Sequence, residues 1–120
     1  MYTIKIREHF SSAHNLRGYK GKCEELHGHN WEVEAAVSSE ELDRTGMVMD
    51  FKDLKGILSG ILSELDHKHL NVLEPFKELN PTSENIAKYI HGRLRSACSG
   101  AEVRYVTVWE TEKASATYSL

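Results

Sequence analysis

Alternation of apolar and polar residues predicts two strands at the start of the chain. From Tyr2 to His14 the even positions are mostly apolar and the odd positions polar, which is the pattern of a half-buried strand. Glu8 interrupts the apolar series, and we interpret it as the site of a β-bulge. From His27 to Val37 the odd positions are apolar or histidine, and glutamates lie on the opposite side. Both predicted strands therefore carry histidines on their apolar side.

Apolar residues at three- and four-residue spacing predict two helices in the middle of the chain. Asp50 can cap the first helix. The run N-P-T-S-E-N then ends one helix and begins another, with Thr82 as N-cap and Glu84 in the first turn, where an acid suits the helix dipole. We expect the second helix to continue to about Gly100. The two apolar stripes consist of Phe51, Leu54, Leu58, Ile61, Leu62 and Leu65, and of Ile86, Ile90 and Leu94.

The remaining segments complete a β-β-α-α-β-β order. Residues 38–46 predict a polar turn and residues 47–50 an extended return, while Val103–Thr111 and Ala114–Leu120 alternate as two further strands. Short connections in this order predict an α+β fold, an antiparallel sheet with two helices on one face. A length of 120 residues predicts a single domain over residues 1–120. The other face of the sheet stays uncovered, and an oligomer is the simplest way to cover it.

Composition narrows the classes of partner and compartment. The formal net charge is −3, so the basic surplus that accompanies nucleic-acid binding is missing and we expect no polynucleotide partner. No apolar run has the length of a secretory signal or a membrane span, and we expect a cytoplasmic protein without membrane contact. The chain has two cysteines, which we expect to be free thiols in a reducing compartment, with Cys98 buried as a small apolar residue.

Three histidines on the two N-terminal strands form a candidate metal site. His27 and His29 project from the same face of one strand. If the strands pair antiparallel through the connection 15–26, His14 reaches the same end of the sheet. Three imidazoles with one open position are typical of catalytic zinc. Two alternatives stay open: the histidines bind no metal, or Cys23 completes a closed structural site.

Two further groups carry possible chemistry. Asp66 and His67 follow the first helix, and the carboxylate could set the tautomer of the ring or pass a proton through it; a polar helix end is the alternative. His69 could form a further metal pair with His67, a weaker option. Glu110 brings a carboxylate to an apolar strand face, where it could accept two parallel hydrogen bonds from a pterin or guanine. Alternatively, the strand has already emerged into solvent there.

Together these motifs resemble one family. C-E-x-x-H-G-H at 23–29, F-S-S-A-H upstream, L-D-H at 65–67, N-P-T-S-E-N at 80–85 and W-E-T at 109–111 occur in the order found in the 6-pyruvoyl-tetrahydropterin synthase family. That family includes the bacterial 6-carboxytetrahydropterin synthases of queuosine biosynthesis. The resemblance covers essentially the whole chain.

The resemblance implies a tunnelling fold (T-fold), in which trimers close a barrel, two trimers stack as a hexamer, and active sites lie between subunits. It implies a Zn²⁺ cofactor and a small-molecule pterin substrate. Thr82 and Glu84 lie in a segment that family members also use near the pterin. The other roles that it implies are zinc ligation by His14, His27 and His29, a catalytic thiol at Cys23, proton relay by Asp66 and His67, and pterin anchoring by Glu110.

The implied reaction starts from 7,8-dihydroneopterin triphosphate, with elimination of triphosphate. In the queuosine branch the side chain is cleaved to leave 6-carboxy-5,6,7,8-tetrahydropterin and acetaldehyde, whereas the biopterin branch keeps a pyruvoyl group. The three-residue gap between Cys23 and His27 resembles the queuosine branch. Glu24 resembles a subgroup that cleaves dihydroneopterin to 6-hydroxymethyl-dihydropterin for folate synthesis, so the chain could serve both reactions; alternatively Glu24 is a solvated loop acid.

Two matters stay open at this point. A non-enzymatic zinc-stabilised module that binds another protein would use Cys23 as a fourth ligand and would unfold on chelation. The triphosphate needs cationic partners, and Arg17, Lys20 and Lys22 lie in the loop beside the predicted site without any one of them standing out.

Overall fold

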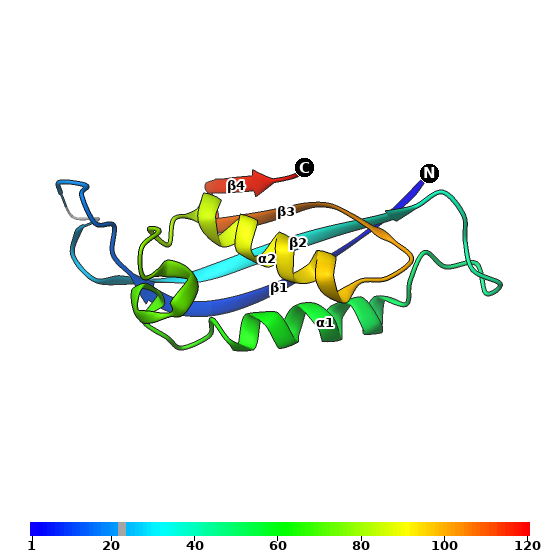
Figure 1. Ribbon diagram of the computed structural model, residues 1–120, viewed down its shortest axis with the longest axis horizontal. Helices are drawn as coiled ribbons and strands as arrows, with labels where there is room; N and C mark the ends of the chain where they lie inside the picture. The colour runs from blue at the N-terminus through cyan, green and yellow to red at the C-terminus, as the bar shows by residue number, and fades with distance from the viewer. Residues whose placement is uncertain (22–23) are drawn as a thin grey trace.

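Within the residues that the structure describes, four antiparallel strands and two α-helices form the fold, in the predicted β-β-α-α-β-β order (Figure 1). The computed structural model describes residues 1–21 and 24–120. The sheet has the strand order β1-β2-β3-β4. Its elements are β1 (Tyr2–His14), β2 (His27–Ser39), α1 (Phe51–Ser63), the single-turn 3₁₀ helices η2 (Leu70–Val72) and η3 (Glu74–Phe76), α2 (Ser83–Ala97), β3 (Glu102–Thr111) and β4 (Ala114–Tyr118).

β1 and β2 pair residue by residue over their whole length, from Tyr2 opposite Ser39 to His14 opposite His27. Glu8 keeps its in-register partner Val33, so the expectation of a bulge there is wrong. The Glu8 carboxylate points toward α1, where Lys55 Nζ lies 3.4 Å from Oε1. The ion pair with Lys55 therefore accommodates the Glu8 carboxylate on the helix-covered face, and the strand needs no bulge to turn it away.

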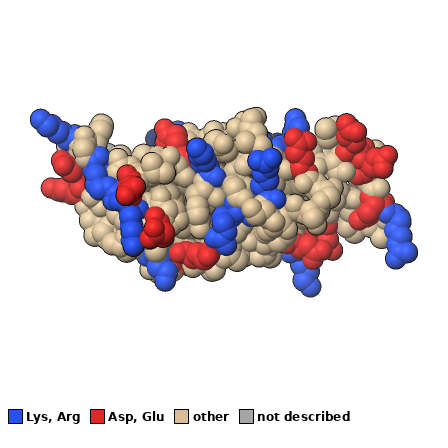
Figure 2. Space-filling model, in the orientation of Figure 1, with Lys and Arg blue, Asp and Glu red and all other residues tan. Residues whose placement is uncertain are grey.

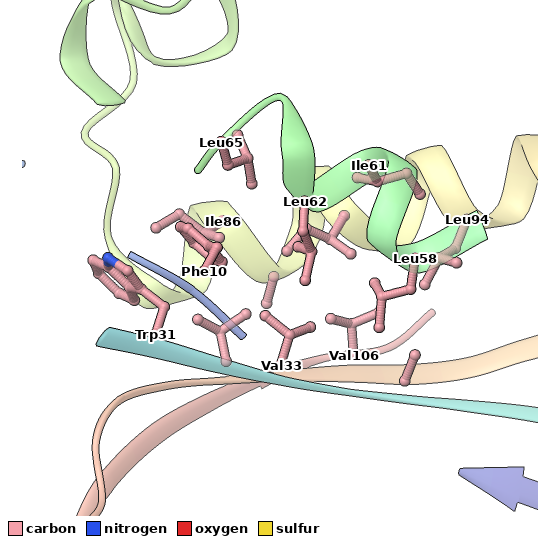
Figure 3. Packing of buried hydrophobic residues seen from close by; sticks show 14 of the residues in the cluster. Phe10, Trp31, Val33, Leu58, Ile61, Leu62, Leu65, Ile86, Leu94 and Val106 are labelled. Carbon is pink, nitrogen blue, oxygen red and sulfur yellow. The ribbon is translucent and has the colours of Figure 1, made fainter. Parts of the chain in front are cut away.

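α1 and α2 cover one face of the sheet, α1 against β1 and α2 against β3 and β4. Figure 3 shows Val33 and Val106 pointing from the sheet toward Leu58 and Ile86 of the helices. The predicted apolar stripes supply this core, except that Phe51 is exposed. Fully buried side chains include Phe10, Trp31, Val33, Leu54, Leu58, Ile86, Ile90, Leu94, Val106 and Val108.

The predicted helix caps are confirmed, whereas some boundaries differ. The Asp50 carboxylate accepts the N–H of Lys52 at 2.8 Å, and the Thr82 hydroxyl accepts the N–H of Asn85 at 3.1 Å. α2 ends at Ala97 rather than near Gly100. Residues 47–50 do not form the expected extended segment; they follow a turn that the Asp43 carboxylate holds by accepting backbone N–H groups. Cys98 is buried as expected, and burial raises the pKa of its thiol.

The face of the sheet away from the helices is polar. Arg7 Nε donates to Glu34 at 3.0 Å, its guanidinium lies 4.4 Å from the centre of the Trp109 ring, and the Tyr105 hydroxyl donates to Glu34 at 2.6 Å. Acidic and basic side chains are also interspersed over the face seen in Figure 2. The oligomer expected to cover the open sheet face stays a prediction.

In the described part of the chain, no helix combines the length and apolarity that crossing a membrane needs.

The core predicts which helix positions control stability. Leu58→Ala should lower the free energy of unfolding by about 2–5 kcal/mol, because it leaves a cavity between α1 and the sheet. Ser59→Ala, an exposed neighbour on the same helix, should change it by less than about 0.5 kcal/mol. Urea unfolding followed by circular dichroism measures both. Equal effects of the two substitutions would contradict the packing described here.

Candidate metal centre and active site

His14, His27, His29 and Glu110 converge at one end of the sheet, and each offers one ligand atom within 4.8 Å of all the others. His14 is the last residue of β1 and lies opposite His27, the first of β2. His29 projects from the same face two residues later. Glu110 lies where the pairing of β3 with β4 shifts register, between Trp109 and Thr111. Such irregularities re-aim side chains, and here a carboxylate joins the three rings.

Backbone carbonyl groups set the tautomer of two of these histidines. His14 Nδ1 lies 2.8 Å from Pro81 O, and His27 Nδ1 lies 2.7 Å from Glu25 O. Because a carbonyl oxygen only accepts, each Nδ1 must carry the hydrogen, and a neutral ring then has its lone pair on Nε2. Burial lowers the pKa of His14, which favours its neutral form.

The two Nε2 atoms face each other at 3.0 Å. In their neutral forms two lone pairs then point into the same space, an arrangement that a cation relieves. Two nitrogen ligands of a tetrahedral zinc ion, each at about 2.0–2.1 Å from the metal, are about 3.3 Å apart. The distance between these atoms therefore fits shared coordination.

His29 supplies an independent test of the fit. Its Nε2 is buried and makes no hydrogen bond within the described residues, although Glu110 Oε1 lies 2.9 Å away. The contact is therefore close in distance without the alignment of a hydrogen bond. Burial lowers the pKa of His29, and the negative charge of Glu110 opposes that shift. Three imidazole nitrogens form a donor set that suits zinc with one position left open, and the Glu110 carboxylate lies beside them.

Trp31 packs against the histidine cluster, a contact that was not predicted from the sequence. The ring is fully buried, and its centroid lies 4.9 Å from that of His14 and 5.2 Å from that of His29. Its Nε1 donates to Ser12 O at 3.2 Å. The H-G-H-N-W spacing already placed the indole on the same strand face as the histidines, which is the signal that could have found it.

Asp66 and His67 contact each other but lie apart from this cluster. Asp66 Oδ1 accepts the N–H of Ser11 at 2.8 Å, and Oδ2 lies 2.9 Å from His67 Nδ1. These two interactions, the first the larger, lower the pKa of Asp66. The His67 side chain is 82% exposed at the outer edge of β1, so the pair does not turn inward toward the histidines of its own chain. His69 instead lies beside Asn15, with Nε2 3.3 Å from Oδ1.

The remaining predicted residues surround the cluster less closely. Thr82 uses its hydroxyl as the cap of α2 and Glu84 is exposed in the first turn, directly after the Pro81 carbonyl that contacts His14. Glu24 is exposed, with its N–H donated to Gly21 O at 3.1 Å.

The three basic loop residues considered as partners for the triphosphate are Arg17, Lys20 and Lys22. The Arg17 guanidinium donates to Phe76 O and Leu79 O at 2.6 and 2.9 Å, so it holds a turn rather than standing free for a phosphate. Lys20 is exposed. Cys23 and Lys22 lie outside the described residues.

Comparison with known proteins places this geometry in context. A model of the family described as 6-pyruvoyl tetrahydropterin synthase matches residues 3–120. A protein of Archaeoglobus fulgidus, provisionally named a 6-carboxy-5,6,7,8-tetrahydropterin synthase, is 43% identical over 91% of this chain and 88% of its own. The dihydroneopterin monophosphate aldolase of Pyrococcus furiosus is 38% identical over 89% and 88%.

A solved structure agrees with the fold as well. The 6-pyruvoyl tetrahydropterin synthase of Caenorhabditis elegans superposes with a TM-score of 0.88 and 34% identity, covering 99% of this chain and 95% of that one. The predicted family resemblance and the T-fold class are thereby confirmed.

The cluster predicts that each histidine contributes to metal affinity. His29→Ala should weaken Zn²⁺ binding by more than about 100-fold, since loss of a partner outside the ligand set alone costs 10–100-fold. Competition with a chromophoric chelator measures the affinity. His9→Ala, on β1 but on the opposite sheet face, is the matched control and should bind as the wild type does. An unchanged affinity in His29→Ala would rule out this cluster as the binding site.

Proposed function

Because the chain belongs to the 6-pyruvoyl tetrahydropterin synthase family, we propose that it is a zinc-dependent lyase of the queuosine branch. Its reaction would convert 7,8-dihydroneopterin triphosphate and one water molecule to 6-carboxy-5,6,7,8-tetrahydropterin, acetaldehyde and triphosphate. The observation that carries the proposal is the convergence of three histidine ring nitrogens, beside one carboxylate, at an end of the sheet. Relatives of this chain include a protein provisionally named for that activity.

The proposed roles follow the chemistry of each side chain. His14, His27 and His29 would hold Zn²⁺, which when bound polarises substrate oxygens and acidifies neighbouring C–H bonds. Cys23 would take up and return protons as a thiolate beside the site. Asp66, whose pKa is lowered, stays ionised and keeps His67 oriented for proton transfer.

The residues proposed to contact the pterin lie on two elements beside the cluster. Glu110 is 34% exposed, and its carboxylate is proposed to accept hydrogen bonds from the pterin, as expected from sequence. Glu84 and Thr82, at the start of α2, are proposed to flank the ring. The hydrogen bond from His14 Nδ1 to Pro81 O supports this placement because it brings the first turn of α2 to the metal site.

The Asp66–His67 pair lies on the outer edge of β1, where the His67 side chain is 82% exposed, and this position favours a site shared between copies. β1 and β4 are the two edges of the sheet, and unpaired edges are templates for pairing with another chain. Antiparallel pairing of one copy's β1 with another's β4 would set Asp66 and His67 beside the β3–β4 hairpin that carries Glu110. Repetition of this contact closes a barrel, and we propose a homo-oligomer, a trimer or a hexamer of two trimers.

A second candidate is cleavage of a dihydroneopterin to 6-hydroxymethyl-dihydropterin. It is favoured by the 38% identical relative named dihydroneopterin monophosphate aldolase and by the exposed Glu24 beside Cys23 in the sequence. Retention of the side chain as a pyruvoyl group is the third outcome within the family.

Product analysis separates these reactions. Wild-type protein loaded with Zn²⁺ and given 7,8-dihydroneopterin triphosphate should release acetaldehyde and 6-carboxytetrahydropterin, identified by mass spectrometry. With dihydroneopterin as substrate, 6-hydroxymethyl-dihydropterin would establish the second activity, and Glu24→Gln should then remove it selectively. Cys23→Ala should keep Zn²⁺ and lose turnover by at least about 100-fold, the usual contribution of an acid–base group. No conversion of either substrate, together with loss of Zn²⁺ in Cys23→Ala, would favour a structural zinc module instead.

Mixing two inactive variants tests whether the site is shared. His29→Ala lacks the metal half and His67→Ala lacks the relay half, so each alone should be inactive. After joint unfolding and refolding at equal amounts, roughly a quarter of the shared sites should combine two intact halves and recover activity. His29→Ala mixed with His27→Ala is the matched control, because both changes fall in the same half. Equal absence of activity in both mixtures would place the whole site within one chain.

A further inference from the structure

The side chain of Asn71 clamps the residue that follows His14, and we infer that Asn71 is a positioning residue for the metal centre. The Asn15 N–H donates to Asn71 Oδ1 at 3.0 Å, and Asn71 Nδ2 donates to Asn15 O at 2.8 Å. Asn71 belongs to η2 and is 8% exposed. The inference rests on the proposed function only through the three-histidine site that it uses.

The clamp continues the hydrogen bonding along the outer edge of β1. The Ala13 N–H already bonds outward to Lys68 O, and the N–H and C=O of Asn15, two residues later, face the same side of the strand. A carboxamide carries the same donor and acceptor as a peptide group. Asn71 therefore supplies both hydrogen bonds of one additional rung, on the outer side of β1.

Both neighbours of His14 are held by one segment. On one side, the Ala13 N–H donates to Lys68 O at 3.0 Å, and Ala13 forms a parallel bridge with His69. On the other side, Asn71 holds Asn15. With the ring of His14 also bonded to Pro81 O through Nδ1, the position of its Nε2 depends on three attachments in addition to the pairing with His27. Metal ligands must be placed to within about 0.5 Å, so loss of one attachment should reduce affinity.

The Asn71 clamp is not needed to hold η2 against the rest of the protein, because other contacts already do so. Leu70, its neighbour in η2, is fully buried, and the Ala13–Lys68 bond also anchors the segment. Removing the Asn71 carboxamide therefore leaves the packing of η2 in place and releases only the backbone beyond His14. We expect its main effect on the metal centre rather than on folding.

The test compares metal affinity with stability in three variants. Asn71→Ala removes both bonds, and Asn71→Asp keeps an acceptor but sets a carboxylate oxygen against the Asn15 carbonyl. Ser38→Ala is the matched control: Ser38 is 1% exposed and its hydroxyl bonds to Thr3 at 2.7 Å, at the other end of the same strand pair. Zn²⁺ affinity is measured by chelator competition, ligand geometry by the visible spectrum of the Co²⁺ form, and folding by thermal unfolding of the metal-free protein.

Both Asn71 variants should unfold cooperatively, bind Zn²⁺ about 10–100-fold more weakly than the wild type and show a changed Co²⁺ spectrum, while Ser38→Ala binds normally. Wild-type affinity in the Asn71 variants would overturn the inference, and so would loss of cooperative unfolding in both, which would assign the clamp to folding. The assay contains no pterin. Zinc binding without pterin turnover in the wild type would therefore defeat the proposed function and leave this inference standing.

Discussion

Two imidazole nitrogens that face each other at 3.0 Å are the constraint around which this end of the molecule is organised. The carbonyls of Pro81 and Glu25 fix the hydrogens of both rings on Nδ1, so each neutral ring directs its lone pair inward. Neither nitrogen can relieve the other without a proton or a cation, and burial disfavours the protonated form of His14. Coordination of a divalent ion resolves this conflict with ligands already in place.

The fold explains why the rings hold that position. Unbroken pairing of β1 with β2 sets His14 opposite His27. Trp31 packs edge-on against His14 and His29, and Pro81, just before α2, contacts His14. Elements far apart in the sequence thus meet at one end of an elongated molecule of 53 × 24 × 21 Å. The same end carries Glu110 and, on the outer edge of β1, the Asp66–His67 pair. Because the chain belongs to a pterin-processing family, we interpret this cluster of histidines and carboxylates as a catalytic site.

Local pattern and motif spacing were enough to predict the order of strands and helices along the chain, both helix caps and the meeting of three histidines, because alternation fixes the face of each strand residue and antiparallel pairing fixes the end. They failed where tertiary contacts decide. Glu8 keeps its register, with Lys55 nearby. Asp66 binds the Ser11 N–H at the edge of β1, and its catalytic role with His67 stays a prediction. Glu110 lies near the histidines at a register shift between β3 and β4, and no residue type in the sequence predicts that shift. Cys23 lies outside the described residues, so its role as a catalytic thiol stays a prediction.

X-ray absorption at the zinc edge of the loaded, substrate-free protein distinguishes an open catalytic site from a closed structural one. We expect scattering from three imidazole rings, with zinc–nitrogen distances of about 2.0–2.1 Å, and a water oxygen as the remaining ligand. A sulfur scatterer at about 2.3 Å, or fewer than three imidazoles, would contradict this expectation.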